Sequence, residues 1–283
     1  MIVDVHSHAW DFPNDFSEAF ISQAKRARAG MEVDLAVRLG EYDAGRPNDE
    51  EVKTIVFGGK AKLSGIWVDD RSVADYVAQA PDRLIGFQSI DPTVNGWTEE
   101  LRHGHQELNL RGIKLLPMYA GFHPQDPMMR ELWSYARANH LPVLLHTGTT
   151  FISQAPIEMT LPRHLDEVAT EFPDVKMICA HLGHPYEGEC IALIRKHPNV
   201  YADLSALFYR PFQLYQSLML VQEYGVWEKI LFGTDYPFTT VADTITGLRN
   251  LNDMLEGTAL PRLDTEQIEA LVYRDSLSLL GLD

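Results

Sequence analysis

Two histidines separated by one residue, His6 and His8, follow a largely apolar run at the start of the chain (Ile2-Val3-Asp4-Val5). In a β-strand, side chains at positions i and i+2 point to the same face. Two imidazoles at this spacing can therefore bind one metal ion from the carboxyl end of a first strand. The spacing alone is a weak signal, because His103 and His105 repeat it in a segment that reads as a solvated helix.

Three later apolar segments each end in a further potential ligand. They are Val143-Leu144-Leu145-His146, Met177-Ile178-Cys179-Ala180-His181 and Ile230-Leu231-Phe232-Gly233-Thr234-Asp235. A parallel barrel brings the carboxyl ends of all its strands to one mouth, so these side chains would converge. His6, His8, His146 and Asp235 would then give three nitrogens and one oxygen, a set that suits Zn²⁺. We therefore predict a metal site.

The expected cofactor is one divalent metal ion. Zn²⁺ is our first choice, and ligands of this type do not separate it from Mn²⁺, Fe²⁺ or Co²⁺. A bound metal lowers the pKa of a water molecule, sometimes to about 7. Asp235 is placed to take the proton from that water, and His181 is placed to polarise a substrate carbonyl or shuttle a proton. The pattern predicts a hydrolase that acts on a small-molecule amide, ester or lactone through a metal-activated water.

Strand-like and helix-like runs alternate nearly from end to end. The expected strands are Ile2–His6, Thr54–Phe57, Leu84–Ile90, Gly112–Leu116, Pro142–His146, Val175–His181, Val200–Leu204 and Ile230–Thr234. The expected helices include Met128–Ala138, His164–Glu171, Glu189–His197, Phe212–Tyr224 and Val241–Leu255. This alternation predicts an α/β protein with a (β/α)₈ TIM barrel, built as a single domain over residues 1–283.

Two segments exceed a minimal barrel. Residues 9–52 form a long connection after the first strand, with an expected helix at Phe16–Ala29. Loops of this kind lie on the catalytic face, so we expect a lid-like insertion, with a purely structural insertion as the alternative. Glu266–Leu282 is expected to form helices that pack on the barrel after the eighth strand.

Bulk properties exclude several classes of protein. The net charge of −16 argues against a nucleic-acid-binding surface, which needs clustered Lys and Arg. Cys179 and Cys190 stand in no disulfide framework, which suits a reducing compartment. No signal-peptide pattern is apparent, and no apolar stretch approaches the ~18 residues that span a bilayer. We expect a cytoplasmic protein with a small-molecule substrate and neither a nucleic-acid nor a membrane partner.

Several motifs along the chain are found together in a known family. They are Asp4-Val5-His6-Ser7-His8, Pro81-Asp82-Arg83-Leu84-Ile85-Gly86-Phe87 with Asp91-Pro92, Gly112-Ile113-Lys114-Leu115, His146-Thr147-Gly148, Phe172-Pro173-Asp174-Val175 with Ala180-His181-Leu182-Gly183, and Gly233-Thr234-Asp235-Tyr236-Pro237. In this order they resemble the amidohydrolase superfamily. The resemblance is closer to the amidohydrolase-2 group, which includes aminocarboxymuconate-semialdehyde decarboxylase.

The resemblance implies metal ligation by His6, His8, His146 and Asp235, with His181 as a catalytic histidine beside the metal. It also implies a frequent homodimer. One departure is that the family's His-x-Gly-Gly motif reads His181-Leu182-Gly183-His184 here, which puts the loop's substrate preference in doubt. In other branches of the superfamily a lysine on the fourth strand bridges two metals. The amidohydrolase-2 group typically has one metal, so Lys114 is expected either to support the metal ligands from behind or to be structural.

Four residues are candidates for substrate binding. Trp10 could form an aromatic wall, and His184 lies in a loop at the mouth. Arg163 and Arg210 follow the fifth and seventh strands, so either could clamp a substrate carboxylate. Core packing or surface ion pairs would explain the same residues without a substrate.

Two other functions remain open. Some relatives are metal-dependent non-oxidative decarboxylases (carboxy-lyases), which would hold an aromatic or unsaturated carboxylic acid on the same metal and release carbon dioxide. A non-catalytic barrel used as a binding module is the third reading. Retention of all the potential ligands argues against it.

Overall fold

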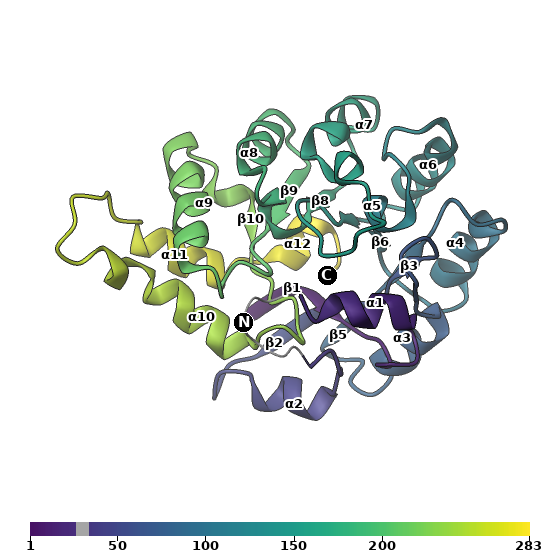
Figure 1. Ribbon diagram of the computed structural model, residues 1–283, viewed down its shortest axis with the longest axis horizontal. Helices are drawn as coiled ribbons and strands as arrows, with labels where there is room; N and C mark the ends of the chain where they lie inside the picture. Colours follow the sequence, from purple (N-terminus) through teal and green to yellow (C-terminus); the bar gives the residue numbers. More distant parts are fainter. Residues whose placement is uncertain (27–33) are drawn as a thin grey trace.

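The computed structural model describes residues 1–26 and 34–283. Eight parallel strands form one sheet in the order β1-β2-β5-β6-β7-β8-β9-β10, and the helices surround it (Figure 1). The strands are β1 (Ile2–His8), β2 (Val52–Phe57), β5 (Leu84–Ile90), β6 (Ile113–Leu115), β7 (Val143–Leu145), β8 (Met177–Cys179), β9 (Val200–Asp203) and β10 (Ile230–Leu231). The predicted (β/α)₈ barrel is confirmed, and each expected strand is present with ends shifted by a few residues.

Backbone hydrogen bonds between β1 and the segment that follows β10 join the two ends of the sheet. The amide of Val5 donates to the carbonyl of Phe232 (3.0 Å), and that of Asp235 donates to the carbonyl of His6 (2.8 Å). The amide of His8 donates to the carbonyl of Tyr236 (3.0 Å). Two potential metal ligands, His6 and Asp235, are therefore fixed to each other through the main chain.

The helices largely follow the predicted pattern. They are α1 (Glu18–Ala24), α2 (Leu39–Ala44), α3 (Asp70–Val77), α4 (Trp97–Gln106), α5 (Pro117–Ala120), α6 (Arg130–Ala138), α7 (Leu165–Glu171), α8 (Glu187–Lys196), α9 (Pro211–Tyr224), α10 (Val241–Arg249), α11 (Thr265–Val272) and α12 (Ser276–Leu280). His103 and His105 lie on α4, as predicted. Of the expected helix Phe16–Ala29, residues 18–24 are helical and residues 27–29 lie outside the described residues.

The barrel interior is closed at its amino-terminal end by the last helix. Val3 and Val5 of β1 pack there with Phe57, and Leu277 and Leu280 of α12 belong to the same buried cluster. The predicted docking of the C-terminal helices on the barrel is therefore confirmed. A second, larger cluster fills the space between the strands and the outer helices. Strands buried on both faces explain why the sequence runs are apolar throughout.

The pairing register of β1 with β2 shifts between Asp4 and Ser7. Val5 belongs to the interior cluster, and yet its neighbour His6 lines the cavity at the mouth. Such irregularities commonly re-aim side chains near active sites. Asp4 lies two residues before His6 and yet does not line the cavity. Its carboxylate instead accepts hydrogen bonds from the hydroxyls of Tyr42 (2.9 Å) and Thr234 (2.7 Å).

The connection after β2 contains a hairpin that we did not predict, β3 (Lys60–Ala61) with β4 (Ile66–Trp67). Its anchor is a buried ion pair, because Lys60 Nζ lies 2.8 Å from Asp70 Oδ2. The same ammonium lies 2.9 Å from Glu100 Oε2. The hairpin is thereby held to α3 and α4. Two-residue strands are too short to show a periodic pattern in the sequence.

We predict that Lys60→Met lowers the free energy of unfolding by about 3 kcal/mol, because it leaves the buried carboxylate of Asp70 without its cation. Urea unfolding followed by circular dichroism measures this. Lys62→Met is the matched control, since the Lys62 side chain is exposed, and it should change stability by less than about 0.5 kcal/mol. Equal effects of the two substitutions would contradict the prediction.

Candidate metal-binding active site

A cavity of about 300 Å³ opens at the carboxyl ends of the strands. Its floor holds the predicted metal-binding and catalytic residues, and its walls come from the insertion after β1 and from the segments after β2, β6, β7, β8, β9 and β10. The floor residues are His6, His8, Lys114, His146, His181 and Asp235. The wall residues include Trp10, Phe20, Arg26, Leu35, Ile66, Tyr119, Phe151, His184, Tyr209, Arg210 and Phe238.

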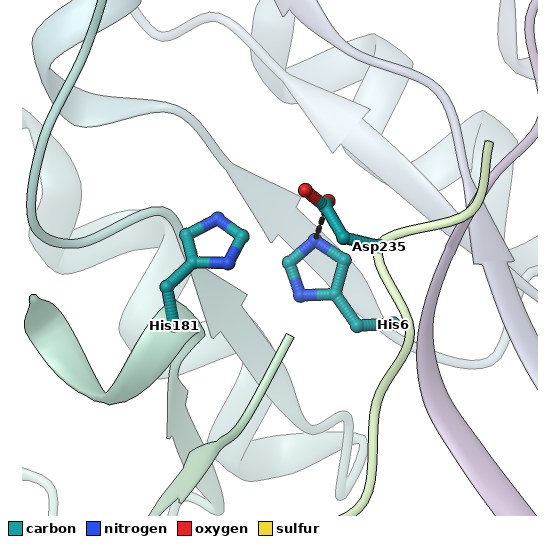
Figure 2. Close-up of side chains that lie close together, drawn as sticks. All are labelled: His6, His181 and Asp235. Carbon is teal, nitrogen blue, oxygen red and sulfur yellow. Dashed lines mark ion pairs between the residues drawn. The ribbon is translucent and has the colours of Figure 1, made fainter. Parts of the chain in front are cut away.

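His6, His181 and Asp235 form the tightest group on this floor. One ligand atom from each lies within 4.8 Å of the others, and all three residues are buried. His6 Nε2 lies 3.3 Å from Asp235 Oδ1, the contact dashed in Figure 2. Among the described residues, this is the one group of three or more such side chains that meets the spacing of a metal site.

The other two predicted ligands border this group. His8 Nε2 lies 3.1 Å from Asp235 Oδ1, and His146 Nδ1 lies 3.3 Å from His181 Nε2. The structure therefore gathers all five predicted metal and catalytic residues in one place. It also brings His181, which we predicted as a catalytic residue, into the tightest group.

Unusual backbone conformations aim two of these side chains. His181 (φ 59°) and Asp235 (φ 64°) are both in the left-handed region. For residues other than glycine this costs on the order of 1 kcal/mol each, and such outliers cluster at functional sites. Gly148, two residues after His146, has φ 96°, and a Cβ there would lie 2.2 Å from the carbonyl oxygen of His184. The turn after β7 therefore requires glycine at this position.

Asp203 and Ser205, at the end of β9, were not predicted as site residues. Asp203 Oδ2 lies 2.9 Å from His6 Nδ1, and Ser205 Oγ lies 3.0 Å from the same nitrogen. Ser205 Oγ also lies 2.7 Å from His181 Nδ1. The available signal was an acidic residue at the end of an apolar strand, Val200-Tyr201-Ala202-Asp203. We had applied that rule to Asp235 alone.

Burial makes most of these imidazoles poor bases. It lowers the pKa of His8 to about 4 and that of His146 to about 3, and it takes the pKa of His181 well below its ordinary value. The pKa of His6 is raised, because Asp203 and Asp235 outweigh burial and the charge of Lys114. Burial raises the pKa of Asp235, but the close contacts with His6 and His8 outweigh it and leave the pKa of Asp235 well below its ordinary range. The site thus combines an ionised carboxylate with mostly neutral imidazoles.

Lys114 lies deep in the same floor. Its Nζ is 3.5 Å from His6 Nε2 and 4.2 Å from the centre of the Phe57 ring. Burial lowers the pKa of its ammonium to about 7, and no carboxylate among the described residues lies within ion-pair distance of it. The expectation that Lys114 is structural rather than a bridging ligand stays a prediction.

The donor set fits a divalent cation. Two imidazoles and a carboxylate in one buried group are ligands that Zn²⁺ and related ions accept. His8 Nδ1 is buried and has no hydrogen-bond partner among the described residues, so that ring is not fully satisfied by protein contacts. A carboxylate oxygen also crowds two imidazole nitrogens at 3.1 and 3.3 Å, an arrangement that a shared cation stabilises.

Three of the four predicted substrate residues line the cavity. Trp10 stacks on His8, with ring centres 4.0 Å apart, and its indole donates to the carbonyl of Leu35 (2.6 Å). Arg210 is half-buried, lies over the Tyr209 ring and donates to the carbonyl of Ala206 (2.9 Å). His184 is buried in the wall.

Arg163, the fourth candidate, does not line the cavity. Its exposed guanidinium pairs with Glu189 of α8, with Nε 2.9 Å from Oε2, and it is absent from the cavity lining. Position after a strand does not fix direction, because the loop after β7 turns this side chain toward the neighbouring helix. The surface ion pair that we had weighed as the alternative is what forms.

Comparison with known proteins identifies the family. The family model described as "Amidohydrolase" matches residues 3–282, almost the whole chain. The chain belongs to the amidohydrolase-2 family. The resemblance seen in its motifs is therefore confirmed, although no curated protein matches.

Solved structures similar to this family member share its fold at low sequence identity. An uncharacterised TIM-barrel protein from Bordetella bronchiseptica has a TM-score of 0.73 and 21% identity, covering 99% of this chain and 98% of that one. A probable 2-pyrone-4,6-dicarboxylic acid hydrolase from Acinetobacter baumannii has 0.66 and 15%, covering 99% of both chains. A 5-carboxyvanillate decarboxylase from Novosphingobium aromaticivorans with bound manganese has 0.65 and 13%, covering 100% of this chain and 97% of that one. Both hydrolases and decarboxylases therefore occur among these neighbours.

Membrane insertion finds no support in the helices. None of those in residues 1–26 and 34–283 combines the length and the apolar composition that crossing a bilayer requires.

We expect the buried side chain of His184 to make the stability of the metal-free protein depend on pH. Burial lowers the pKa of His184 to about 4, from an ordinary value of 6.5, so between these values the unfolded chain binds the proton and the folded chain does not. Its contribution to stability is present above pH 6.5 and is lost as the pH falls toward 4. We predict that His184→Asn reduces the loss of unfolding free energy over this range by about 2 kcal/mol.

Urea unfolding at a series of pH values, in the presence of a chelator, measures this slope. His103→Asn on the exposed face of α4 is the control and should leave the slope unchanged. An unchanged slope in His184→Asn would mean that this ring accepts a proton in the folded state.

Proposed function

We propose that this amidohydrolase-2 protein is a metal-dependent hydrolase of a small-molecule amide, ester or lactone. The observation that carries the proposal is the buried group of His6, His181 and Asp235 at the floor of a cavity, with His8 and His146 in contact with it. A carboxylate held ionised beside neutral imidazoles offers both a proton acceptor and hydrogen-bonding groups that do not compete for the proton.

The cation would be held by Asp235 and by histidines from the set His6, His8, His146 and His181. We propose Zn²⁺ first; the manganese in the decarboxylase structure keeps Mn²⁺ open, and Fe²⁺ and Co²⁺ also accept these ligands. When bound, such an ion acts as a Lewis acid toward water and carbonyl oxygen.

The protein residues have separate roles in this proposal. Asp235 is the proton acceptor at the floor, because its low pKa keeps it ionised and its Oδ1 lies against the ring nitrogens of His6 and His8. His181, placed across the group from Asp235, transfers a proton to the leaving group through its Nε2. Trp10, stacked on His8, holds one side of the cavity closed to water.

The cavity favours a planar, negatively charged substrate. Its described lining residues include the two arginines Arg26 and Arg210, and Lys114, whose pKa burial lowers to about 7, against a single carboxylate, Asp235. This excess of positive charge is opposite in sign to the net charge of −16 of the whole chain, so the cavity is a local attractor for anions. Aromatic walls from Trp10 and other rings suit a flat substrate. Two structural neighbours are named for substrates that are planar and negatively charged, 2-pyrone-4,6-dicarboxylic acid and 5-carboxyvanillate.

Non-oxidative decarboxylation of an aromatic or unsaturated acid is the alternative. The same cation-rich cavity favours it, and a decarboxylase is among the structural neighbours. In that case the carboxylate that leaves would lie at the floor group, whereas in the hydrolase a retained carboxylate would lie at Arg210. A cytoplasmic location, the absence of nucleic-acid partners and a homodimer stay predictions.

We predict that protein purified without added metal or chelator holds about one equivalent of divalent metal, and that this is lost in His6→Ala/His8→Ala. The metal-loaded protein should hydrolyse aryl lactones or esters that carry a carboxylate. Asp235→Asn should reduce kcat at least about 100-fold, because its proton acceptor is gone. Elemental analysis and a spectrophotometric screen, with carbon dioxide release assayed in parallel, measure these quantities.

His103→Ala/His105→Ala is the matched control, because it removes the same spacing from α4, outside the cavity, and should change neither metal content nor turnover. Carbon dioxide release without hydrolysis would show that the protein is a decarboxylase and would overturn the proposed hydrolase function. Failure to bind metal even after reconstitution would overturn both. Two equivalents would identify Lys114 as a bridging ligand.

Arg210→Met tests the anion preference. We predict a rise in KM of about 10-fold or more for substrates with a carboxylate, since a hydrogen-bonded charge pair is lost, and little change for their methyl esters. Arg163→Met is the control, because Arg163 pairs with Glu189 outside the cavity. Equal changes for the acid and the ester would exclude Arg210 as the anion-binding group.

A further inference from the structure

We propose that Asp203 and Ser205 are positioning residues that fix which ring nitrogen carries the proton in His6 and His181, so that both rings turn a bare Nε2 toward the metal group. This inference rests on the proposed metal site. Asp203 is the last residue of β9 and Ser205 lies two residues beyond it, and neither lines the cavity.

Asp203 receives hydrogen bonds from fixed donors. Its Oδ1 accepts from the backbone amides of His181 and Ser205, each at 3.0 Å, and from the Ser205 hydroxyl at short range. Both amides carry a hydrogen in every state of the protein, so this carboxylate acts as an acceptor. Its other oxygen, Oδ2, lies 2.9 Å from His6 Nδ1. The neutral His6 ring therefore carries its proton on Nδ1 and leaves Nε2 bare.

Ser205 transmits the same constraint to His181. Its hydroxyl has one hydrogen, which is directed at Asp203 Oδ1, so its lone pairs face the nearby ring nitrogens. His181 Nδ1 lies 2.7 Å from that oxygen and 3.2 Å from the carbonyl oxygen of Ser205, which can only accept. His181 is therefore also protonated on Nδ1, and its Nε2 is bare.

The consequence is a group of lone pairs that face one another. His6 Nε2 meets Asp235 Oδ1 at 3.3 Å, and His181 Nε2 meets His146 Nδ1 at 3.3 Å. His146 Nε2 lies 3.1 Å from the carbonyl of Thr149, which places the proton of that ring on Nε2 and leaves Nδ1 bare as well. Opposed lone pairs repel unless a cation lies between them. A single buried carboxylate thus prepares ligands from two separate strands, in the way that groups behind metal ligands fix tautomers elsewhere.

The test uses metal-free full-length protein labelled with ¹⁵N in its histidines. Long-range ¹H–¹⁵N correlation spectra, recorded at mildly alkaline pH so that the rings are neutral, report the protonated nitrogen of each ring. Signals are assigned with His6→Gln and His181→Gln. We expect His6 and His181 to be protonated on Nδ1 in the wild type. Either ring protonated on Nε2 would overturn the proposal without any variant of Asp203.

Asp203→Asn gives the sharper result. The two backbone amides that point at Oδ1 will hold the amide oxygen there, so the new NH₂ group faces His6 Nδ1. We expect His6 to change to the Nε2-protonated form while His181 keeps its proton on Nδ1. A purely structural role for Asp203 would leave both tautomers as they are, and that result would contradict the proposal.

Metal affinity is the second readout, measured by competition of Zn²⁺ between the protein and a chromophoric chelator. We expect the dissociation constant to rise about 10- to 100-fold in Asp203→Asn and to stay near the wild-type value in Ser205→Thr, which keeps the hydroxyl. Unchanged affinity in Asp203→Asn would overturn the positioning role. Neither readout uses turnover, so a failure of the proposed hydrolysis would leave this inference standing.

Discussion

The contact between β1 and the segment after β10 is the constraint on which the rest of the site depends. The amide of Asp235 donates to the carbonyl of His6, so a main-chain hydrogen bond joins the first and the last of the predicted metal ligands along the chain. Asp4 strengthens this contact, because its buried carboxylate accepts hydrogen bonds from the backbone amide (3.0 Å) and the hydroxyl (2.7 Å) of Thr234. Burial raises the pKa of Asp4 to about 6 despite these hydrogen bonds. This contact between β1 and the segment after β10 brings His6 Nε2 and Asp235 Oδ1, from residues 229 positions apart, within 3.3 Å.

Much of the fold could be predicted because barrels repeat one simple pattern. Apolar runs of limited length, separated by amphipathic stretches, indicated every strand of the barrel, and the ligand-type residues at their ends indicated the mouth. Strand ends were less accurate, because β7, β8 and β10 stop before their ligands, which lie on irregular backbone. The hairpin β3–β4 was missed because its strands are two residues long.

The contributions of single side chains were harder to predict than the strands that carry them. Arg163 and Arg210 both follow strands, but only Arg210 lines the cavity, since loop direction is a tertiary property. Asp203 was missed for a related reason. It lies at a strand end behind the ligand His6, and the sequence does not distinguish such an acid from any other buried acid. Asp4 and His6 are two residues apart, but only His6 lines the cavity, because the register of β1 shifts between Asp4 and Ser7. Position in the sequence thus located the site, and local backbone geometry decided which residues enter it.

The insertion after β1 is tied to the far side of the mouth. The rings of Phe20 and Phe151 are in contact, and Gln23 of α1 accepts from the amide of Ser153 (2.7 Å) while donating to Gln154 (3.0 Å). The Arg26 guanidinium donates to the carbonyl of Phe151 (3.1 Å). These contacts join the segment after β1 to the loop after β7, so the two segments form one connected part of the cavity rim. Relatives that accept bulkier substrates on the same barrel floor would need changes in both loops together, so the two segments are expected to vary as a pair during the divergence of substrate range.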